Sequence, residues 1–191
     1  MENEHTGQEK RIYIFLGPPY SGKETQTTPL SHKLEIPVFS MGQLIREGRQ
    51  NPQIDEAFKK YSLKGLHVPI EIKFSLLKDR MDEATKGFIL DNFPATTEDL
   101  DALNAYLGSN ELSVNRAFYL RISESEMLRR FEENPARGRA DDSKETLLVR
   151  SKVQGVDREP VLEYFGEQGK LVEINGEQPV ELVAEEISRN L

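Results

Sequence analysis

Residues 12–26 decide the fold: the run Ile12-Tyr-Ile-Phe-Leu16 is followed at once by Gly17-Pro-Pro-Tyr-Ser-Gly22-Lys23-Glu24-Thr25-Gln26. The first five residues are continuously apolar, which is typical of a strand buried on both faces of a parallel sheet. The frame Gly-x4-Gly-Lys that follows has the spacing of a phosphate-binding loop, although the strict pattern has Ser or Thr where this chain has Glu24. The stretch therefore predicts a strand, a phosphate loop and the start of a helix.

The chemistry of such a loop follows from its residues. Gly17 and Gly22 can adopt backbone angles that other residues resist, so that the N–H groups of the loop turn inward toward phosphate oxygens. The positive end of the next helix lies beside them. Lys23 would reach the β- and γ-phosphates, and Thr25 would add a hydroxyl. The alternative is a Gly/Pro turn that carries a solvated lysine.

The rest of the chain alternates short apolar runs with longer amphipathic stretches, which predicts a three-layer α/β/α fold around a five-stranded parallel sheet. The ligand edge of such a sheet lies at the carboxyl ends of its strands. Helix signals are an Asn51-Pro52 start, a start at Pro69, a capping box at Ser123, and a start near Pro179. Asp142 is expected to cap a long helix toward Phe165, in which Gly155 and Pro160 are possible breaks. The further strands are expected at 36–39, 87–90, 117–122 and 171–174.

Composition excludes several classes of protein. The chain has 191 residues, enough for a single domain over residues 11–191 behind a polar tail, residues 1–10, that we expect to be disordered. Its 25 Lys and Arg against 33 Asp and Glu give a net charge of −8, which disfavours nucleic acid and anionic membranes as partners. Cysteine is absent, and the three histidines lack metal-ligand spacing. No apolar run is long enough for a membrane span, so a cytoplasmic location is expected.

Six motifs in order make the chain resemble the adenylate kinase family of nucleoside monophosphate kinases, over nearly all of residues 11–191. The loop Gly17–Gln26 is the first motif, with Tyr20 and Glu24 in place of two glycines. The others are Ser40-Met-Gly-Gln-Leu-Ile-Arg46, Gly65-Leu-His-Val-Pro69, Gly87-Phe-Ile-Leu-Asp-Asn-Phe-Pro-Ala95, Gly138-Arg-Ala-Asp-Asp142 with Arg150 beyond it, and Val172-Glu-Ile-Asn-Gly-Glu-Gln-Pro179.

The resemblance implies a fold of the P-loop NTPase type, an acceptor-binding insert at about 41–70 and a short lid at about 132–143. It implies the reaction MgATP + AMP ⇌ 2 ADP, carried out by a monomer with ATP and AMP as its small-molecule partners. Phosphoryl transfer asks the protein to position two nucleotides and to stabilise spread negative charge, for which arginine is well suited.

Roles for individual residues also follow from the resemblance. Lys23, Arg139 and Arg150 would be catalytic, and Asp91 would hold Mg²⁺ through water. For Arg46 and Arg150 the alternative is an exposed helix arginine, and for Asp91 it is a turn residue. The donor ATP would contact Gly17, Tyr20, Ser21, Gly22, Lys23, Glu24, Thr25, Arg129 and Gln178. The acceptor would contact Met41, Arg46, Leu66, His67, Val68, Asn92, Phe93, Pro94, Arg139 and Arg150.

The chain departs from the family pattern at the site itself. Ala95 and Glu133 stand where the family has phosphate-binding arginines. Arg137 is a candidate for a partial substitute, but the interpretation we favour is a solvated charge of the lid. Met41 replaces a threonine, and Asp99 replaces a glutamine that reads adenine. Two alternatives to an adenylate kinase therefore stay open: a degenerate nucleotide-binding member with little activity, and a kinase for another monophosphate such as CMP or UMP.

Overall fold

Five parallel strands form one sheet in the order β2-β3-β1-β4-β5 in the computed structural model, which describes residues 10–134 and 143–191. The predicted fold class is confirmed, and each predicted strand is present with ends shifted by at most two residues. The predicted tail lies outside the described residues except for Lys10. The strands are β1 (Arg11–Leu16), β2 (Val38–Ser40), β3 (Gly87–Asp91), β4 (Arg116–Arg121) and β5 (Leu171–Asn175).

The helices begin where capping residues predict them. Asn51 accepts a hydrogen bond from the backbone N–H of Gln53, and Ser123 accepts one from the N–H of Glu126. The helices are α1 (Lys23–Leu34), α2 (Met41–Glu47), α3 (Pro52–Lys60), α4 (Ile70–Glu83), α5 (Thr97–Ser109), α6 (Glu124–Glu133), α7 (Lys144–Glu167) and α8 (Val180–Arg189), with short 3-10 turns η1 (Gly48–Gln50) and η2 (Ser62–Lys64).

Two expectations about these helices are wrong. Ser143, rather than Asp142, caps α7, because its side chain accepts a hydrogen bond from the N–H of Thr146. Gly155 and Pro160 do not divide α7, which runs unbroken over 24 residues. The buried face of its second half, which includes Val161, holds the helix against the sheet where local propensity would allow a break.

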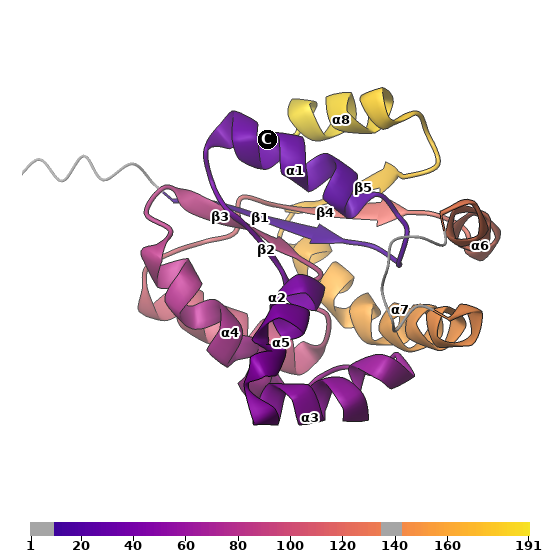
Figure 1. The fold of residues 1–191 in the computed structure, drawn as a ribbon. Coiled ribbons are helices and arrows are strands. Elements are labelled where there is room, and N and C mark those ends of the chain that lie inside the picture. Colours follow the sequence, from indigo (N-terminus) through magenta and orange to yellow (C-terminus); the bar gives the residue numbers. More distant parts are fainter. Residues whose placement is uncertain (1–9, 135–142) are drawn as a thin grey trace, which may run out of the picture.

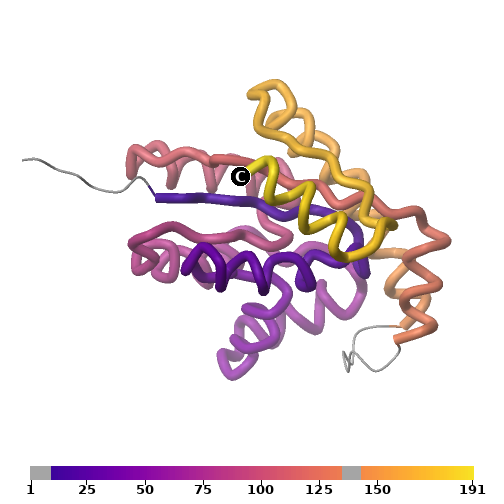
Figure 2. The backbone as a smooth tube through the Cα atoms, turned by 90° about the horizontal axis from the view of Figure 1, so that it is seen from above, coloured from indigo at the N-terminus to yellow at the C-terminus, as the bar shows by residue number. Residues whose placement is uncertain are grey.

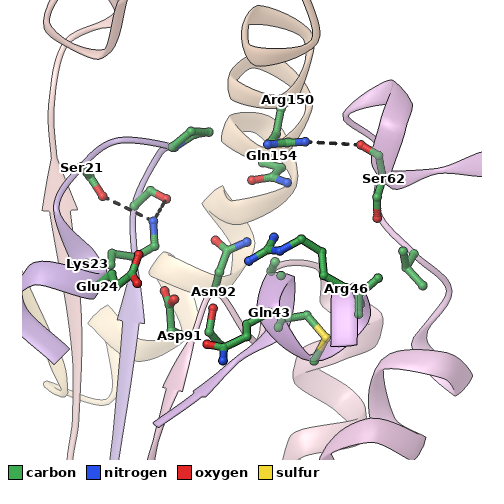
Figure 3. A pocket seen from close by; sticks show the side chains of 18 of the residues that line it. Ser21, Lys23, Glu24, Gln43, Arg46, Ser62, Asp91, Asn92, Arg150 and Gln154 are labelled. Atoms are coloured by element: carbon green, nitrogen blue, oxygen red, sulfur yellow. Dashed lines mark hydrogen bonds between the residues drawn. The ribbon is translucent and has the colours of Figure 1, made fainter. Parts of the chain in front are cut away.

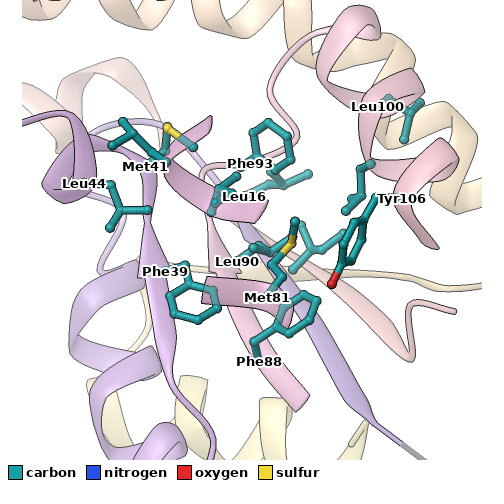
Figure 4. Packing of buried hydrophobic residues seen from close by; sticks show 14 of the residues in the cluster. Leu16, Phe39, Met41, Leu44, Met81, Phe88, Leu90, Phe93, Leu100 and Tyr106 are labelled. Carbon is teal, nitrogen blue, oxygen red and sulfur yellow. The ribbon is translucent and has the colours of Figure 1, made fainter. Parts of the chain in front are cut away.

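The helices cover both faces of the sheet, as Figures 1 and 2 show. On one face α1 and α8 pack over Tyr13 and Phe15 of β1. On the other, α2–α5 and α7 pack over Ile12, Ile14 and Leu16, in the larger of two hydrophobic clusters (Figure 4). Because successive side chains of a strand point to opposite faces, β1 must be apolar at every position from Ile12 to Leu16 to serve both clusters. No helix within 10–134 and 143–191 is both long and apolar enough to cross a membrane.

The strand order places the loop after β1 at a topological switch point. From β1 the chain goes outward to β2 and returns through β3, and it then crosses to β4 and β5 on the other side of β1. The crossovers that leave β1 and its neighbour β3 thus run in opposite directions, so the carboxyl ends of these two strands open onto a crevice where ligands bind in this class of sheet. Asp91, at the end of β3, lies beside Phe15 of β1 in the ladder.

Leu77→Ala should lower the free energy of unfolding by about 2–5 kcal/mol, because Leu77 on α4 is fully buried and its truncation leaves a cavity in the larger cluster. Leu63→Ala is the matched control, since Leu63 is exposed, and it should change stability by less than about 0.5 kcal/mol. Urea unfolding of both variants measures the difference. Equal effects would contradict the placement of α4 in the core.

Candidate active site

A cavity of about 250 Å³ opens at the carboxyl ends of β1 and β3. Most of its lining comes from segments that are distant in the sequence: the loop after β1, α2, the segment after η2, the loop after β3, and α7. Residues of β2, α3 and α4 also line it. Figure 3 shows their polar side chains pointing into it. The predicted site residues among its lining are Gly17, Tyr20, Ser21, Gly22, Lys23, Glu24, Met41, Arg46, Leu66, His67, Val68, Asp91, Asn92 and Arg150.

The loop after β1 is shaped by two glycines. Gly17 has φ +153°, and a Cβ there would lie 2.6 Å from the carbonyl oxygen of Leu120 and 2.7 Å from Ser21 Oγ. Gly22 has φ +91° and caps α1. The ammonium of Lys23 lies over the loop and donates to the carbonyl oxygens of Gly17 at 2.9 Å and Pro18 at 3.1 Å. The lysine is therefore held at the mouth of the loop and inside the cavity lining.

Tyr20 fits the loop in spite of its size. Its backbone takes φ 62°, and its ring packs edge-on against Phe131 of α6, with centroids 5.7 Å apart. Its carbonyl oxygen accepts a hydrogen bond from Arg130 Nη1 at 3.1 Å, while Arg130 Nη2 donates to the carbonyl of Gly176 at 2.7 Å. Arg130 thus joins the loop to the turn after β5, a role that the sequence did not reveal.

The donor-side residues are divided between two cavities. Glu24 is exposed and lines the main cavity, where Figure 3 shows it near Lys23 and Asp91. Thr25 and Gln178 line a second cavity of about 160 Å³ on the other side of the loop. Gln178 donates there to the carbonyl of Asn175 at 3.1 Å.

Arg129, the predicted donor-base contact, lines neither cavity. Its guanidinium pairs with Glu126 at 2.7 Å and with Glu133 at 2.5 Å. Hydrogen bonds from Arg129 and Arg130 hold the pKa of Glu126 at about 2. The arginine that lines the second cavity is its neighbour Arg130, which also pairs with Glu126.

Two arginines enter the main cavity from opposite sides. Arg46, in the last turn of α2, extends toward Asn92 (Figure 3). Arg150, on α7, donates to the carbonyl of Ser62 at 3.4 Å. Gly65 allows this approach, because a Cβ there would lie 2.9 Å from the backbone nitrogen of Arg150. The segment around η2 therefore rests directly on α7.

The loop after β3 offers two side chains with unsatisfied acceptors. Asp91 is 8% exposed, and its Oδ1 has no hydrogen-bond partner among the residues described. Asn92, at φ 60°, follows with an Oδ1 that also lacks one. Phe93 and Pro94 contribute no lining, and Phe93 is fully buried in the larger cluster. Two buried acceptor oxygens without a donor make this loop a place where a hydrated metal ion or a hydrogen-bond donor of a ligand would fit.

The segment after η2 forms one wall of the cavity. Leu66 is exposed, Val68 is buried, and His67 lies between them with Nε2 3.3 Å from Asp157 Oδ2. Burial is the main cause that lowers the pKa of His67 below its ordinary 6.5, so its imidazole is neutral at pH 7. On the facing wall Met41 is buried at the first position of α2. These side chains make this part of the cavity largely uncharged.

Asp99 does not line the cavity, because its carboxylate is held in a buried ion pair. Its side chain is fully buried, pairs with the ammonium of Lys73 and accepts from the backbone N–H of Ala95 at 3.0 Å. Lys73, on α4, and Ala95 both line the cavity. The sequence carried a signal for Lys73 that was missed: it stands three and four residues before Leu76 and Leu77, on the apolar face of α4.

The predicted lid lies mostly outside the described residues. Arg137 and Arg139 fall in the segment 135–142, so the structure does not place them. Glu133, at the end of α6, is described and pairs with Arg129.

Lys73→Met should destabilise the fold by about 3–5 kcal/mol, because it leaves the buried Asp99 carboxylate without its cation. The double variant Lys73→Met/Asp99→Asn removes both charges and keeps an acceptor for the N–H of Ala95, so most of the loss should be regained. Urea unfolding of the two single variants and the double variant measures this coupling. Simple additivity of the single effects would show that the pair is not coupled.

The comparisons with known proteins agree with this geometry. The family model described as adenylate kinase matches residues 15–170. Among curated relatives, the adenylate kinase of Mycolicibacterium paratuberculosis is 39% identical over 166 residues, which are 85% of this chain and 90% of that protein. That of Mycolicibacterium smegmatis is 40% identical over 167 residues with the same coverage, and that of Corynebacterium aurimucosum is 36% identical over 177 residues, or 91% and 94%. The chain therefore belongs to the adenylate kinase family.

Proposed function

We propose that this chain catalyses the reversible transfer of the γ-phosphoryl group of MgATP to AMP, which yields two molecules of ADP. The observation that carries the proposal is the convergence of Lys23, Arg46 and Arg150 on one cavity in a protein whose net charge is −8. Such a local cluster of cations is what a polyphosphate requires. In the reaction an oxygen of the AMP phosphate bonds to the γ-phosphorus as the bond to the β–γ bridging oxygen of ATP breaks.

The positions of the cations suggest a division of labour. Lys23, at the loop, would hold the phosphates of ATP, and Arg46, beside Asn92, would hold the phosphate of AMP. Arg150 enters between these two sides from α7 and would contact the transferring group. Because both nucleotides would be fixed by rigid elements, much of the barrier would be lowered by positioning and by preorganised charge.

Asp91 fits the Mg²⁺ that accompanies ATP. Its carboxylate is buried at the end of β3 and lines the cavity, and its Oδ1 has no protein donor among the described residues. Mg²⁺ keeps several waters and binds through few carboxylates, so one such oxygen could hold a water of the hydrated ion. When bound, the metal neutralises phosphate charge. Asp91 would orient it without taking part in proton transfer.

The side chains that surround the acceptor base are less charged than the phosphate side. His67 is neutral at pH 7, and Asp99 is neutralised by Lys73. A wall of this kind accepts a planar base between Leu66, Val68 and Met41. AMP is the acceptor we propose from the family to which the chain belongs.

Lys23→Ala should reduce turnover of ATP plus AMP by on the order of 10²-fold or more, because it removes a preorganised charge from the transferring phosphates. The melting temperature should not fall, since Lys23 lies at the start of α1 and outside the core. Lys33→Ala, an exposed lysine at the other end of α1, is the matched control. A coupled assay for ADP with a parallel melting curve measures both quantities, and unchanged turnover would refute the assignment of the loop.

The same assay run with AMP, CMP, UMP and GMP tests the acceptor. We expect AMP to have the highest kcat/KM, with a margin over the other acceptors below about a thousandfold. The reason is that Asp99 pairs with Lys73 and the N–H of Ala95, so its side chain does not form hydrogen bonds that would select the base. A higher value for CMP or UMP would replace the proposed acceptor. The absence of turnover with all four, together with ATP binding, would favour a nucleotide-binding member without catalysis.

Ala95→Arg should raise kcat/KM for the acceptor by about tenfold or more, because a new guanidinium on the cavity wall would meet the acceptor phosphate. Ala95→Met adds bulk without charge and is the matched control, expected to lower the same ratio. Steady-state kinetics with AMP as the varied substrate measures the effect. A fall in both variants would mean that the cavity has no room for a further cation.

A further inference from the structure

Arg158 is a buried cation that the site described above does not use. It lies on α7, one turn beyond Gln154 and two turns beyond Arg150, on the face that those two residues turn toward the cavity. Only 3% of Arg158 is exposed, whereas Arg150 and Gln154 line the cavity. Arg158 therefore lies behind the cavity, against the sheet.

The surroundings of Arg158 leave its charge without a counter-ion. Its Nη2 makes a long contact of 3.5 Å with the carbonyl oxygen of Gly17, and its guanidinium carbon lies 5.8 Å from the ring centroid of Tyr119. Its Nε has no hydrogen-bond partner in the part of the chain that the structure describes. Among the residues of 10–134 and 143–191, no carboxylate lies within 4.0 Å of it. Burial lowers the pKa of Arg158, but a guanidinium still keeps its proton at neutral pH.

The carbonyl that Arg158 contacts is the one that Lys23 also contacts. Lys23 Nζ donates to the oxygen of Gly17 at 2.9 Å, so two cations meet at one acceptor. Two like charges that share one acceptor repel each other, and the low exposure of Arg158 reduces the screening of this repulsion by water. A buried guanidinium with an unsatisfied donor lowers the stability of the fold without nucleotide. Such a cost is typical of residues whose interactions are completed when a ligand binds.

We propose that Arg158 is a positioning residue that releases Lys23 to bound phosphate. When Lys23 turns from the Gly17 carbonyl to the phosphates, Arg158 remains as the donor to that carbonyl, so the loop keeps its hydrogen bond. The repulsion between the two cations is relieved in the same movement, and the phosphate brings negative charge toward the buried guanidinium. The proposal rests on the function proposed above, because it takes the ligand of the loop to be the polyphosphate of ATP.

The stability of the protein without nucleotide gives a test with a definite sign. Arg158→Met keeps most of the volume of the side chain and removes the charge. We expect its melting temperature to equal or exceed that of the unaltered protein, since an uncompensated buried charge is lost. In a Lys23→Met background, Arg158→Met should raise the melting temperature by less, because the repulsion is already gone. A clear fall in melting temperature in the otherwise unaltered chain would make Arg158 a structural residue only.

Binding measured by calorimetry tests the ligand side. Arg158→Met should weaken ATP by about tenfold and leave adenosine, which has no phosphate, unchanged. Arg158→Lys keeps the charge and should retain part of the affinity. Lys152→Met is the matched control, because it removes an exposed cation from the same helix and should not alter ATP binding.

Each other outcome overturns the proposal in a recognisable way. Equal loss of ATP and adenosine affinity would indicate a distorted fold, and equal effects of Lys152→Met and Arg158→Met would indicate only the total charge. An undiminished loss of ATP affinity in the Lys23→Met background would mean that Arg158 does not act through Lys23. If the unaltered protein binds no ATP, the proposed function fails as well; if it binds ATP and Arg158→Met binds it equally, only the role of Arg158 fails.

Discussion

Burial of β1 on both faces is the constraint on which the remaining structure depends. Alternate side chains of this strand belong to separate hydrophobic clusters, so neither helical layer can shift without disturbing the other. Its carboxyl end is fixed at the point where the chain changes direction across the sheet. Gly17 must follow there, since the Leu120 carbonyl of β4 leaves no room for a side chain. The loop is thus positioned by the core of the protein.

The site concentrates positive charge in an acidic protein, and the fold handles each cation differently. Lys73 is neutralised by Asp99 in the interior, while Arg129 is paired with glutamates at the surface of α6. Lys23 and Arg158 instead meet at a backbone carbonyl, which can accept hydrogen bonds but cannot cancel two charges. The buried charge of Arg158, which has no carboxylate partner among the described residues, is thus available to an anionic ligand of the loop.

Sequence patterns predicted the elements and motifs whose signals are local. The loop after β1 and the places of Arg46 and Arg150 follow from short spacings, and the structure brings them to one cavity. The contacts of Lys73 and Arg158 could not be foreseen, because Asp99 and the Gly17 carbonyl lie far from them in the sequence. Their position was nevertheless visible: each is a lone cation on the apolar face of its helix. Which of the neighbours Arg129 and Arg130 lines a cavity depends on how α6 packs beside the loop after β1. A motif spacing along the sequence does not contain that information.

Gly65 has a consequence for how the two sides of the cavity can move. Its backbone lies so close to that of Arg150 that the segment after η2 and the first half of α7 touch without an intervening side chain. Between two backbones in direct contact there is no flexible side chain that could absorb a displacement of one toward the other. A rotation that carried α2, α3 and η2 outward would therefore either take Arg150 with it or separate the two surfaces at this glycine. How closely the segment after η2 can approach α7 therefore depends on the absence of a side chain at Gly65.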